Sequence, residues 1–203
     1  MITNHPYRVL SSWNDSFHFC DWGGVSCGKR HKRVTRVGLI SKGLEGSLSP
    51  HVGNLTFLRE FLLFNNSFEG TIADWRCWNL VLATFKECYL ARSIGNLSYR
   101  LCSLHLEFNR LHGYVPSSIG NLVGLTTLHL SFNRFIGKIP STIGRLKNLQ
   151  LATFVENQFS GQIPDEIGNL TLMTKLALDF KQVRRPHSIK PWESASSNWV
   201  GSF

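Results

Sequence analysis

A repeat of 24 residues runs through most of this 203-residue chain and restricts the folds open to it. Asn109, Asn133 and Asn157 recur at this spacing, and three glycines and three prolines recur with them. The shared pattern is L-x-x-L-x-L-x-x-N-x-L-x-G-x-I-P-x-x-I-G-x-L, and its complete copies span residues 101–124, 125–148 and 149–172. Because one coil of this length cannot bury its apolar side alone, the copies are predicted to stack around a shared core.

Two earlier copies and one partial later copy extend the repeat. Residues 34–57 and 58–73 keep most apolar positions, although Lys42 and Ala73 replace the expected Asn and Pro. A further copy starts at Met173 and loses the pattern soon afterwards. Because neighbouring strands lie about 4.8 Å apart, five coils would form a curved stack about 25 Å long.

The L-x-L segment of each copy is predicted to form a short strand with leucines pointing inward and the intervening side chains outward. The recurring asparagines stand where the chain leaves this strand. Their buried amides are expected to bond backbone groups of their own and adjacent coils. This structural ladder consists of Asn66, Asn109, Asn133 and Asn157. The predicted fold class is an α/β repeat, a solenoid with a curved parallel β-sheet.

The L-x-G-x-I-P segment resembles the plant subtype of leucine-rich repeat, and the likeness covers residues 34–178 apart from one irregular stretch. Residues 10–27 resemble the N-terminal cap of plant receptor-like kinases and receptor-like proteins. The matching cap residues are Trp13, Cys20, Trp22, Gly24, Val25 and Cys27. The chain is thus similar to the ectodomains of the receptor group that perceives bacterial flagellin and elongation factor.

The resemblance implies a disulfide between Cys20 and Cys27 and hence an oxidising, extracellular compartment; two unrelated thiols are the alternative. In the family this cap begins with an amphipathic helix after a signal peptide. Residues 1–14 resemble only the last part of that helix, lack a secretory signal, and indicate a truncated fragment. The expected domains are a partial cap (1–33), leucine-rich repeats (34–180, irregular at 74–100) and a basic, poorly ordered tail (181–203).

The repeat breaks between its second and third recognisable copies. Leu63 and Leu106 are equivalent but 43 residues apart, where two coils would need 48. We interpret the intervening segment as a coil that has lost about five residues and its strand. The alternative is a functional island, since such islands bind ligands in some family members. Cys77, Cys88 and Cys102 fall in this region, so at least one of them is free if the cap disulfide forms.

The net charge of +9 suggests a nucleic-acid partner, but the charges lie in two places. Residues 29–36 hold five basic side chains and no acid, and the tail carries a net charge of +3. The remaining chain has a net charge of only +1, and no aromatic and basic groove follows a phosphate backbone. We therefore expect no nucleic-acid partner.

Motifs for catalysis are absent from the sequence. It holds no G-x-G-x-x-G, H-R-D or D-F-G, so the kinase domain of the resembled receptors is missing and no enzyme activity is expected. The histidines form no metal-ligand spacing with cysteines or acids, and neither a metal nor another cofactor is expected. No apolar run reaches the roughly 18 residues that a membrane span requires.

The outward positions of the predicted strands supply a candidate ligand site on the concave face. His105 lies beside His129 and Phe108 beside Phe132, with Glu107 and Ser131 flanking them. Exposed aromatic side chains on adjacent strands are typical of peptide-binding surfaces. The alternative is that a recent duplication copied H-L-x-F-N-R into both coils.

Five sequons mark possible glycosylation sites if the chain enters the secretory pathway. They are Asn14, Asn54, Asn65, Asn96 and Asn169. A glycan on Asn65 would stand at the rim of the concave face beside Asn66 and would limit ligand access there.

The resemblance implies a peptide- or protein-binding module of a cell-surface receptor kinase that acts in ligand perception and defence signalling and recruits a co-receptor kinase. One alternative is a stand-alone secreted repeat protein, similar to the co-receptor ectodomains or to polygalacturonase inhibitors. Another is a non-functional relic of a Ser/Thr receptor kinase gene. By the same resemblance, the protein belongs at the cell surface.

Overall fold

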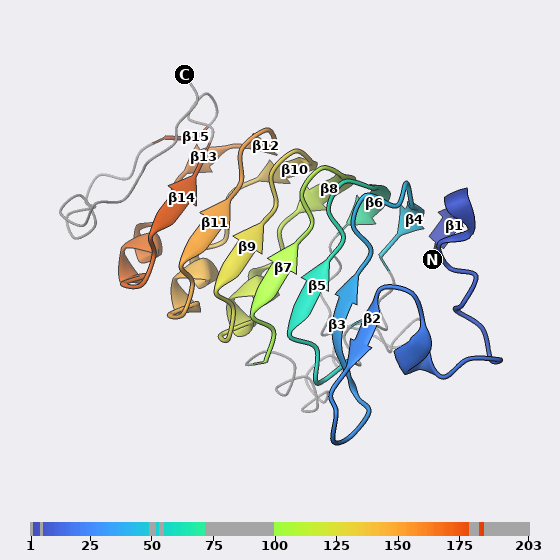
Figure 1. Cartoon of the computed structure of the whole chain (residues 1–203). Helices are drawn as coiled ribbons and strands as arrows, with labels where there is room; N and C mark the ends of the chain where they lie inside the picture. The colour runs from blue at the N-terminus through green and yellow to red at the C-terminus, as the bar shows by residue number, and fades with distance from the viewer. Residues whose placement is uncertain are drawn as a thin grey trace, which may run out of the picture.

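The computed structural model describes residues 2–4, 6–48, 52, 55–71, 100–178 and 183–184. In these residues the chain winds into a stack of coils, and most coils contribute one strand to each of two sheets (Figure 1). The leucine-rich half of each coil forms a strand of the first sheet, and the residues after the ladder asparagine form a strand of the second. The predicted solenoid with parallel strands is confirmed.

The first sheet follows the predicted L-x-L segments. Its strands are β2 (Val25–Cys27), β3 (Val34–Gly38), β5 (Glu60–Leu62), β7 (Ser103–His105), β9 (Thr127–His129), β11 (Leu151–Thr153) and β14 (Lys175–Ala177). Their order is β14-β11-β9-β7-β5-β3-β2, and only the β2–β3 pair is antiparallel. Leu104 pairs with Leu128, and Leu128 pairs with Ala152, so equivalent side chains form columns across the sheet.

The sequence predicted extended segments after the asparagines, and the structure pairs them into a second sheet. Its strands are β1 (Ile2–Asn4), β4 (Glu45–Ser47), β6 (Ser67–Thr71), β8 (Arg110–Tyr114), β10 (Arg134–Gly137) and β12 (Gln158–Phe159). They lie in this sequence order, and only β1 runs antiparallel to its neighbour. A repeat that aligns the first strands also aligns these segments, so their backbone groups meet and bond.

Three short 3-10 helices return the chain from the second sheet to the first. They are η6 (Ser117–Asn121), η7 (Ser141–Arg145) and η8 (Asp165–Asn169). Each follows a repeat proline in extended conformation, and each buries the isoleucine of the I-G-x-L segment. Within the described residues, no helix is long and apolar enough to cross a membrane.

One continuous core lies between the sheets and the 3-10 helices. Leu104, Leu106, Leu128 and Leu130 are fully buried, as inward-pointing leucines of the first sheet should be. Phe135 of the second sheet is also fully buried. Each coil is therefore stabilised mainly by apolar area that it shares with the next coil.

The ladder asparagines connect neighbouring coils. Asn133 Nδ2 donates to the carbonyl oxygen of Leu130 in its own coil (3.2 Å) and to that of Leu106 in the preceding coil (2.9 Å). Its Oδ1 accepts from the backbone N–H of Leu111 (3.0 Å). Asn66, Asn109 and Asn157 make equivalent contacts. One buried amide thus satisfies several backbone groups that no strand pairs.

The register across the irregular stretch corrects the interpretation of a shortened coil. β5 and β7 are direct neighbours, with Leu62 opposite His105, 43 residues later. The next pair, His105 and His129, is separated by an ordinary coil of 24 residues. The chain between β5 and β7 is therefore one coil with 19 additional residues, not two coils that lost five. Residues 72–99, with Cys77 and Cys88, lie outside the described residues; Cys102 is a free thiol.

The cap contains the disulfide that the resemblance implied. Cys20 and Cys27 are bonded, with their Cα atoms 5.5 Å apart. Trp13 stacks on Trp22 with ring centroids 5.1 Å apart, and Trp13 Nε1 donates to the carbonyl oxygen of Gly23 (2.9 Å). The two tryptophans and the disulfide together hold the cap against β2 and β3.

Two terminal segments differ from expectation. Ile2–Asn4 forms strand β1, and Pro6–Arg8 forms the 3-10 helix η1, where the resemblance suggested the end of an α-helix. The edge of β4 offers unpaired backbone groups to β1, and Pro6 cannot donate within a helix. In the tail, Val183–Arg184 forms β15 and pairs with β13 (Gly161–Gln162), so this part is ordered.

Candidate functional site

The strand face, defined as the side of the first sheet away from the core, brings the predicted aromatic pairs together. The rings of His105 and His129 lie 4.3 Å apart on neighbouring strands, as the repeat register requires. Phe108 and Phe132 stack almost in parallel, with centroids 4.2 Å apart and an interplanar angle of 8°. Their exposed fractions are 48% and 42%, so the stacked pair presents apolar ring surface to solvent.

A left-handed backbone turn places these phenylalanines. Phe108 and Phe132 both have a φ of 55°, and Ser41, Asn65 and Glu156 share this conformation at the same repeat position. Left-handed backbone costs a bulky residue about 1–2 kcal/mol. The turn permits the N–H of Phe108 to donate to Ser131 O (3.1 Å), so the bonds between coils compensate this cost. Every coil has the turn, which therefore belongs to the fold, whereas the aromatic side chain distinguishes only two coils.

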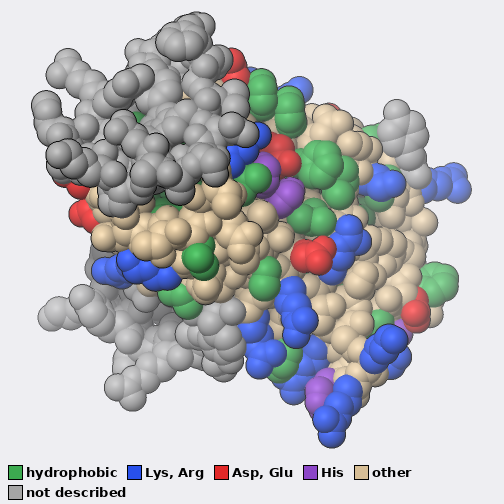
Figure 2. All heavy atoms as spheres, turned by 60° about the vertical axis from the view of Figure 1, so that its left-hand side comes forward, with side chains coloured by type: hydrophobic (Ala, Val, Ile, Leu, Met, Phe, Trp, Pro, Cys, Tyr) green, Lys and Arg blue, Asp and Glu red, His purple; other side chains and the backbone are tan. Residues whose placement is uncertain are grey.

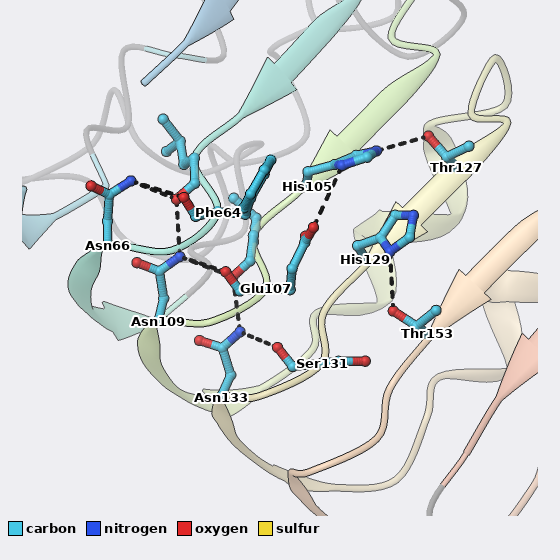
Figure 3. Close-up of polar contacts among 12 residues, drawn as sticks. Phe64, Asn66, His105, Glu107, Asn109, Thr127, His129, Ser131, Asn133 and Thr153 are labelled. Carbon is cyan, nitrogen blue, oxygen red and sulfur yellow. Dashed lines mark hydrogen bonds and ion pairs between the residues drawn. The ribbon is translucent and has the colours of Figure 1, made fainter. Parts of the chain in front are cut away.

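The two histidines join a polar row across three strands (Figure 3). His105 Nε2 lies 3.3 Å from Thr127 Oγ1, and His129 Nδ1 lies 3.3 Å from Thr153 Oγ1. His105 Nδ1 also lies 3.6 Å from Glu107 Oε1. Each imidazole is thereby held on edge against its neighbour.

Burial and the nearby charge of His105 lower the pKa of His129, and Lys175 acts in the same direction. Glu107 opposes them by raising this pKa. Because burial is the largest cause, the neutral imidazole is favoured. His129 therefore presents a neutral, polar ring to the strand face at pH 7.

Glu107 and Ser131 do not have the surface roles that the sequence predicted. Ser131 is buried, with 5% of its surface exposed, and only 14% of the Glu107 side chain is exposed. Ser131 Oγ and Glu107 Oε2 have no hydrogen-bond partner. The prediction that Ser131 flanks an exposed patch is therefore wrong, and Glu107 contributes mainly through His105.

The sequence interpretation missed Phe64. Its ring lies 6.5 Å from that of His105 and extends the aromatic surface toward β5 (Figure 3). Phe64 occupies the position equivalent to Glu107, so the register that gave the other columns could have identified it. We name Phe64, His105, Phe108, His129 and Phe132 the aromatic patch.

The surroundings of the aromatic patch carry little excess charge. In the space-filling view, histidines lie among hydrophobic and acidic side chains, while Lys and Arg gather elsewhere, toward the lower right (Figure 2). Arg36 is paired with Glu60 at 2.9 Å on the same sheet. Within the described ranges, no cluster of three or more His, Cys, Asp or Glu side chains could hold a metal ion.

Three of the predicted glycosylation sites lie on the described surface. Asn14, Asn65 and Asn169 are exposed. Asn65 Nδ2 donates to Ser41 Oγ (2.9 Å) in the preceding coil, next to the aromatic patch. Asn54 and Asn96 lie outside the described residues.

Comparisons with known proteins define the class. The leucine rich repeat N-terminal domain matches residues 1–28, and the Leucine Rich Repeat matches residues 100–122 and 124–146. This chain is a leucine-rich repeat protein with an N-terminal domain of that type. Its homologues are plant leucine-rich repeat receptor-like kinases, and the matches lie in their repeat ectodomains.

One such relative is the LRR receptor-like serine/threonine-protein kinase EFR of Arabidopsis thaliana, 49% identical over 69 residues. The match covers 34% of this chain and 7% of EFR. Among solved structures, the Arabidopsis receptor kinase HAESA in complex with the peptide hormone IDA and the co-receptor SERK1 superposes with a TM-score of 0.71 and 30% identity. That match covers 89% of this chain and 28% of HAESA.

A shorter ectodomain is also similar. The BIR2 ectodomain of Arabidopsis thaliana gives a TM-score of 0.65 at 28% identity, covering 81% of this chain and 79% of that one. Against the receptor kinases, by contrast, the chain spans about a tenth or less of their length.

Proposed function

We propose that this chain is the peptide-binding module of a plant cell-surface receptor, and that the aromatic patch is its contact surface. The stacked, half-exposed rings of Phe108 and Phe132 beside the histidine pair carry this proposal. A soluble repeat protein gains nothing in its core from two rings held in solvent. Such rings instead gain buried area when an apolar ligand side chain covers them.

The chemistry of the patch suits a peptide with an apolar or aromatic anchor. The rings of Phe64, Phe108 and Phe132 supply apolar area, and the neutral imidazoles supply one donor and one acceptor each for peptide backbone groups. The rim cation Arg36 is already paired with Glu60. The ligand is therefore recognised by shape and apolar contact more than by net charge.

The biological setting follows from the relatives. HAESA, in its solved complex, holds a peptide hormone together with a co-receptor. By analogy, this chain acts outside the cell, without catalytic activity of its own, and a co-receptor kinase joins it when the ligand is bound. The cap disulfide supports an oxidising compartment.

A co-receptor-like or stand-alone role is the second candidate. The similarity in size to the BIR2 ectodomain favours it, because that short ectodomain is matched over 79% of its length. In that role the strand face would contact another receptor ectodomain in place of a free peptide.

Selection of peptides from a displayed random library on the folded chain tests the proposal. Selected peptides should bind the Phe108→Ala/Phe132→Ala variant at least about tenfold more weakly, because hot-spot rings contribute about 2 kcal/mol or more. The matched control is Tyr114→Ala/Ile136→Ala, which removes exposed apolar side chains from the second sheet (67% and 36% exposed). If both variants bind the selected peptides as the parent does, the aromatic patch is not the contact surface.

A further inference from the structure

A hollow of about 490 Å³ lies between the N-terminal cap and the first coil. Trp13, Phe19 and Trp22 of the cap form one wall, and Phe57 lies in the opposite wall. Its volume falls within the roughly 300–1,000 Å³ of small-molecule sites. The hollow belongs to the cap and does not include any residue of the aromatic patch.

One donor in this wall has no acceptor. Trp22 Nε1 is buried without a hydrogen-bond partner, whereas Nε1 of the stacked Trp13 donates to Gly23 O at 2.9 Å. Buried indole N–H groups ordinarily find a partner, and leaving one unpaired is unfavourable. An acceptor atom that enters the hollow beside Trp22 would supply the missing bond.

The remaining wall is positively charged. His31, Lys32 and Arg33 line the hollow, and none of its described lining residues is an Asp or Glu. The Arg33 guanidinium lies 4.2 Å from the centroid of the Phe57 ring, so the cation is held against the aromatic wall. A ligand in the hollow thus meets aromatic surface, an unpaired donor and unneutralised cations.

We propose that this hollow binds a small aromatic carboxylate. The ring of the ligand packs against the cap aromatics, and its carboxylate accepts from Trp22 Nε1 and from the Arg33 guanidinium. The carboxylate group is required because it is both an acceptor and an anion. The aromatic ring is required because the walls are largely apolar. This site is separate from the peptide surface and does not depend on the function proposed for it.

Titration of the full chain with 2-naphthoate, followed by calorimetry and by the indole N–H resonances in two-dimensional NMR spectra, tests the proposal. Saturable binding should move the Trp22 indole resonance, which the Trp22→Phe variant assigns. Trp22→Phe and Arg33→Gln should each weaken binding about tenfold, the usual effect of a lost charged hydrogen bond. 2-Naphthalenemethanol, which has the ring without the charge, should bind at least tenfold more weakly.

The controls are matched pairs. Trp13→Phe removes the neighbouring indole N–H, which is already bonded within the protein, and Arg100→Gln removes the second guanidinium over Phe57 (4.4 Å), which does not line the hollow. Both should retain naphthoate affinity within about threefold. Equal binding of the neutral alcohol, equal loss in Arg33→Gln and Arg100→Gln, or an unmoved Trp22 resonance would each overturn the proposal. Circular dichroism of each variant verifies that the cap remains folded.

Discussion

At the scale of single residues, His129 connects the strand face to pH. Burial and His105 lower its pKa in the folded state below the unfolded value of 6.5. The unfolded chain therefore binds the proton more readily, and stability that is fully present above pH 6.5 is lost as the pH falls through this value toward the folded pKa. His129→Gln should remove this contribution and flatten the dependence between pH 7.5 and 5.

Denaturant unfolding at a series of pH values measures the effect. His112→Gln is the control, since His112 is an exposed residue of the second sheet. Its stability should follow the parent chain in its pH dependence. A His129→Gln variant with the same slope as the parent would show that His129 is not the group responsible.

The ladder contacts permit a second prediction. Asn133→Ala should lower the free energy of unfolding by about 2–4 kcal/mol, because it leaves the carbonyls of Leu106 and Leu130 and the N–H of Leu111 buried without a partner. Asn148→Ala is the matched control. Asn148 is exposed and makes a single bond to Val123 O, so its loss should cost less than about 1 kcal/mol. Equal costs in chemical denaturation would contradict the ladder's role.

Most of the patch could be predicted from the sequence because a strand places equivalent residues side by side. This reasoning paired His105 with His129 and Phe108 with Phe132. It was wrong for Ser131 because β9 ends at His129. Beyond that point the backbone turns toward its left-handed conformation at Phe132, and the alternation of inward and outward side chains no longer applies.

At the scale of elements, the stacked 3-10 helices set a strict requirement for glycine. A Cβ atom on Gly120 would overlap the backbone oxygen of Thr142, and one on Gly144 would overlap that of Glu166. At Gly168 nothing lies within 4 Å. Gly120→Ala and Gly144→Ala should therefore lower the free energy of unfolding by about 1–3 kcal/mol, whereas Gly168→Ala should change it by less than about 1 kcal/mol.

Thermal unfolding of the three variants, which share one chemical change, measures this difference. A similar loss at all three positions would indicate that intrinsic backbone preference, and not contact between neighbouring helices, decides the outcome. The sequence alone predicts the turn at each I-G-x-L segment. It does not predict the contact, because the distance between neighbouring helices depends on how closely the coils stack.

At the scale of the whole molecule, the direct pairing of β5 with β7 predicts that the longer coil can be reduced. Removing residues 74–92 deletes 19 residues and leaves a coil of 24. Because the strands on both sides are already paired, the shortened chain should keep the register of Leu62 with His105. Its loop-closure entropy should change by less than about 1 kcal/mol.

Hydrogen exchange of β5 and β7, together with the midpoint of thermal unfolding, provides the measurement. Retained protection in both strands is the expected result. Loss of cooperative unfolding would mean that the deleted residues supply necessary core. The sequence could not decide between a shortened pair of coils and one lengthened coil. A spacing of 43 fits both, and only the hydrogen bonds between strands select the second.

Both sheets begin with a strand that runs against the direction of the coils, β2 beside β3 and β1 beside β4. At the opposite side, the first sheet of the described residues ends with β14, which runs parallel to β11. Another coil placed before the cap would meet a reversed edge, whereas one placed beyond β14 would find the pairing that β14 itself uses. The stack therefore has a sealed start and an open direction of growth. Evolution or design can lengthen its recognition surface by duplicating coils at that end, without disturbing the cap.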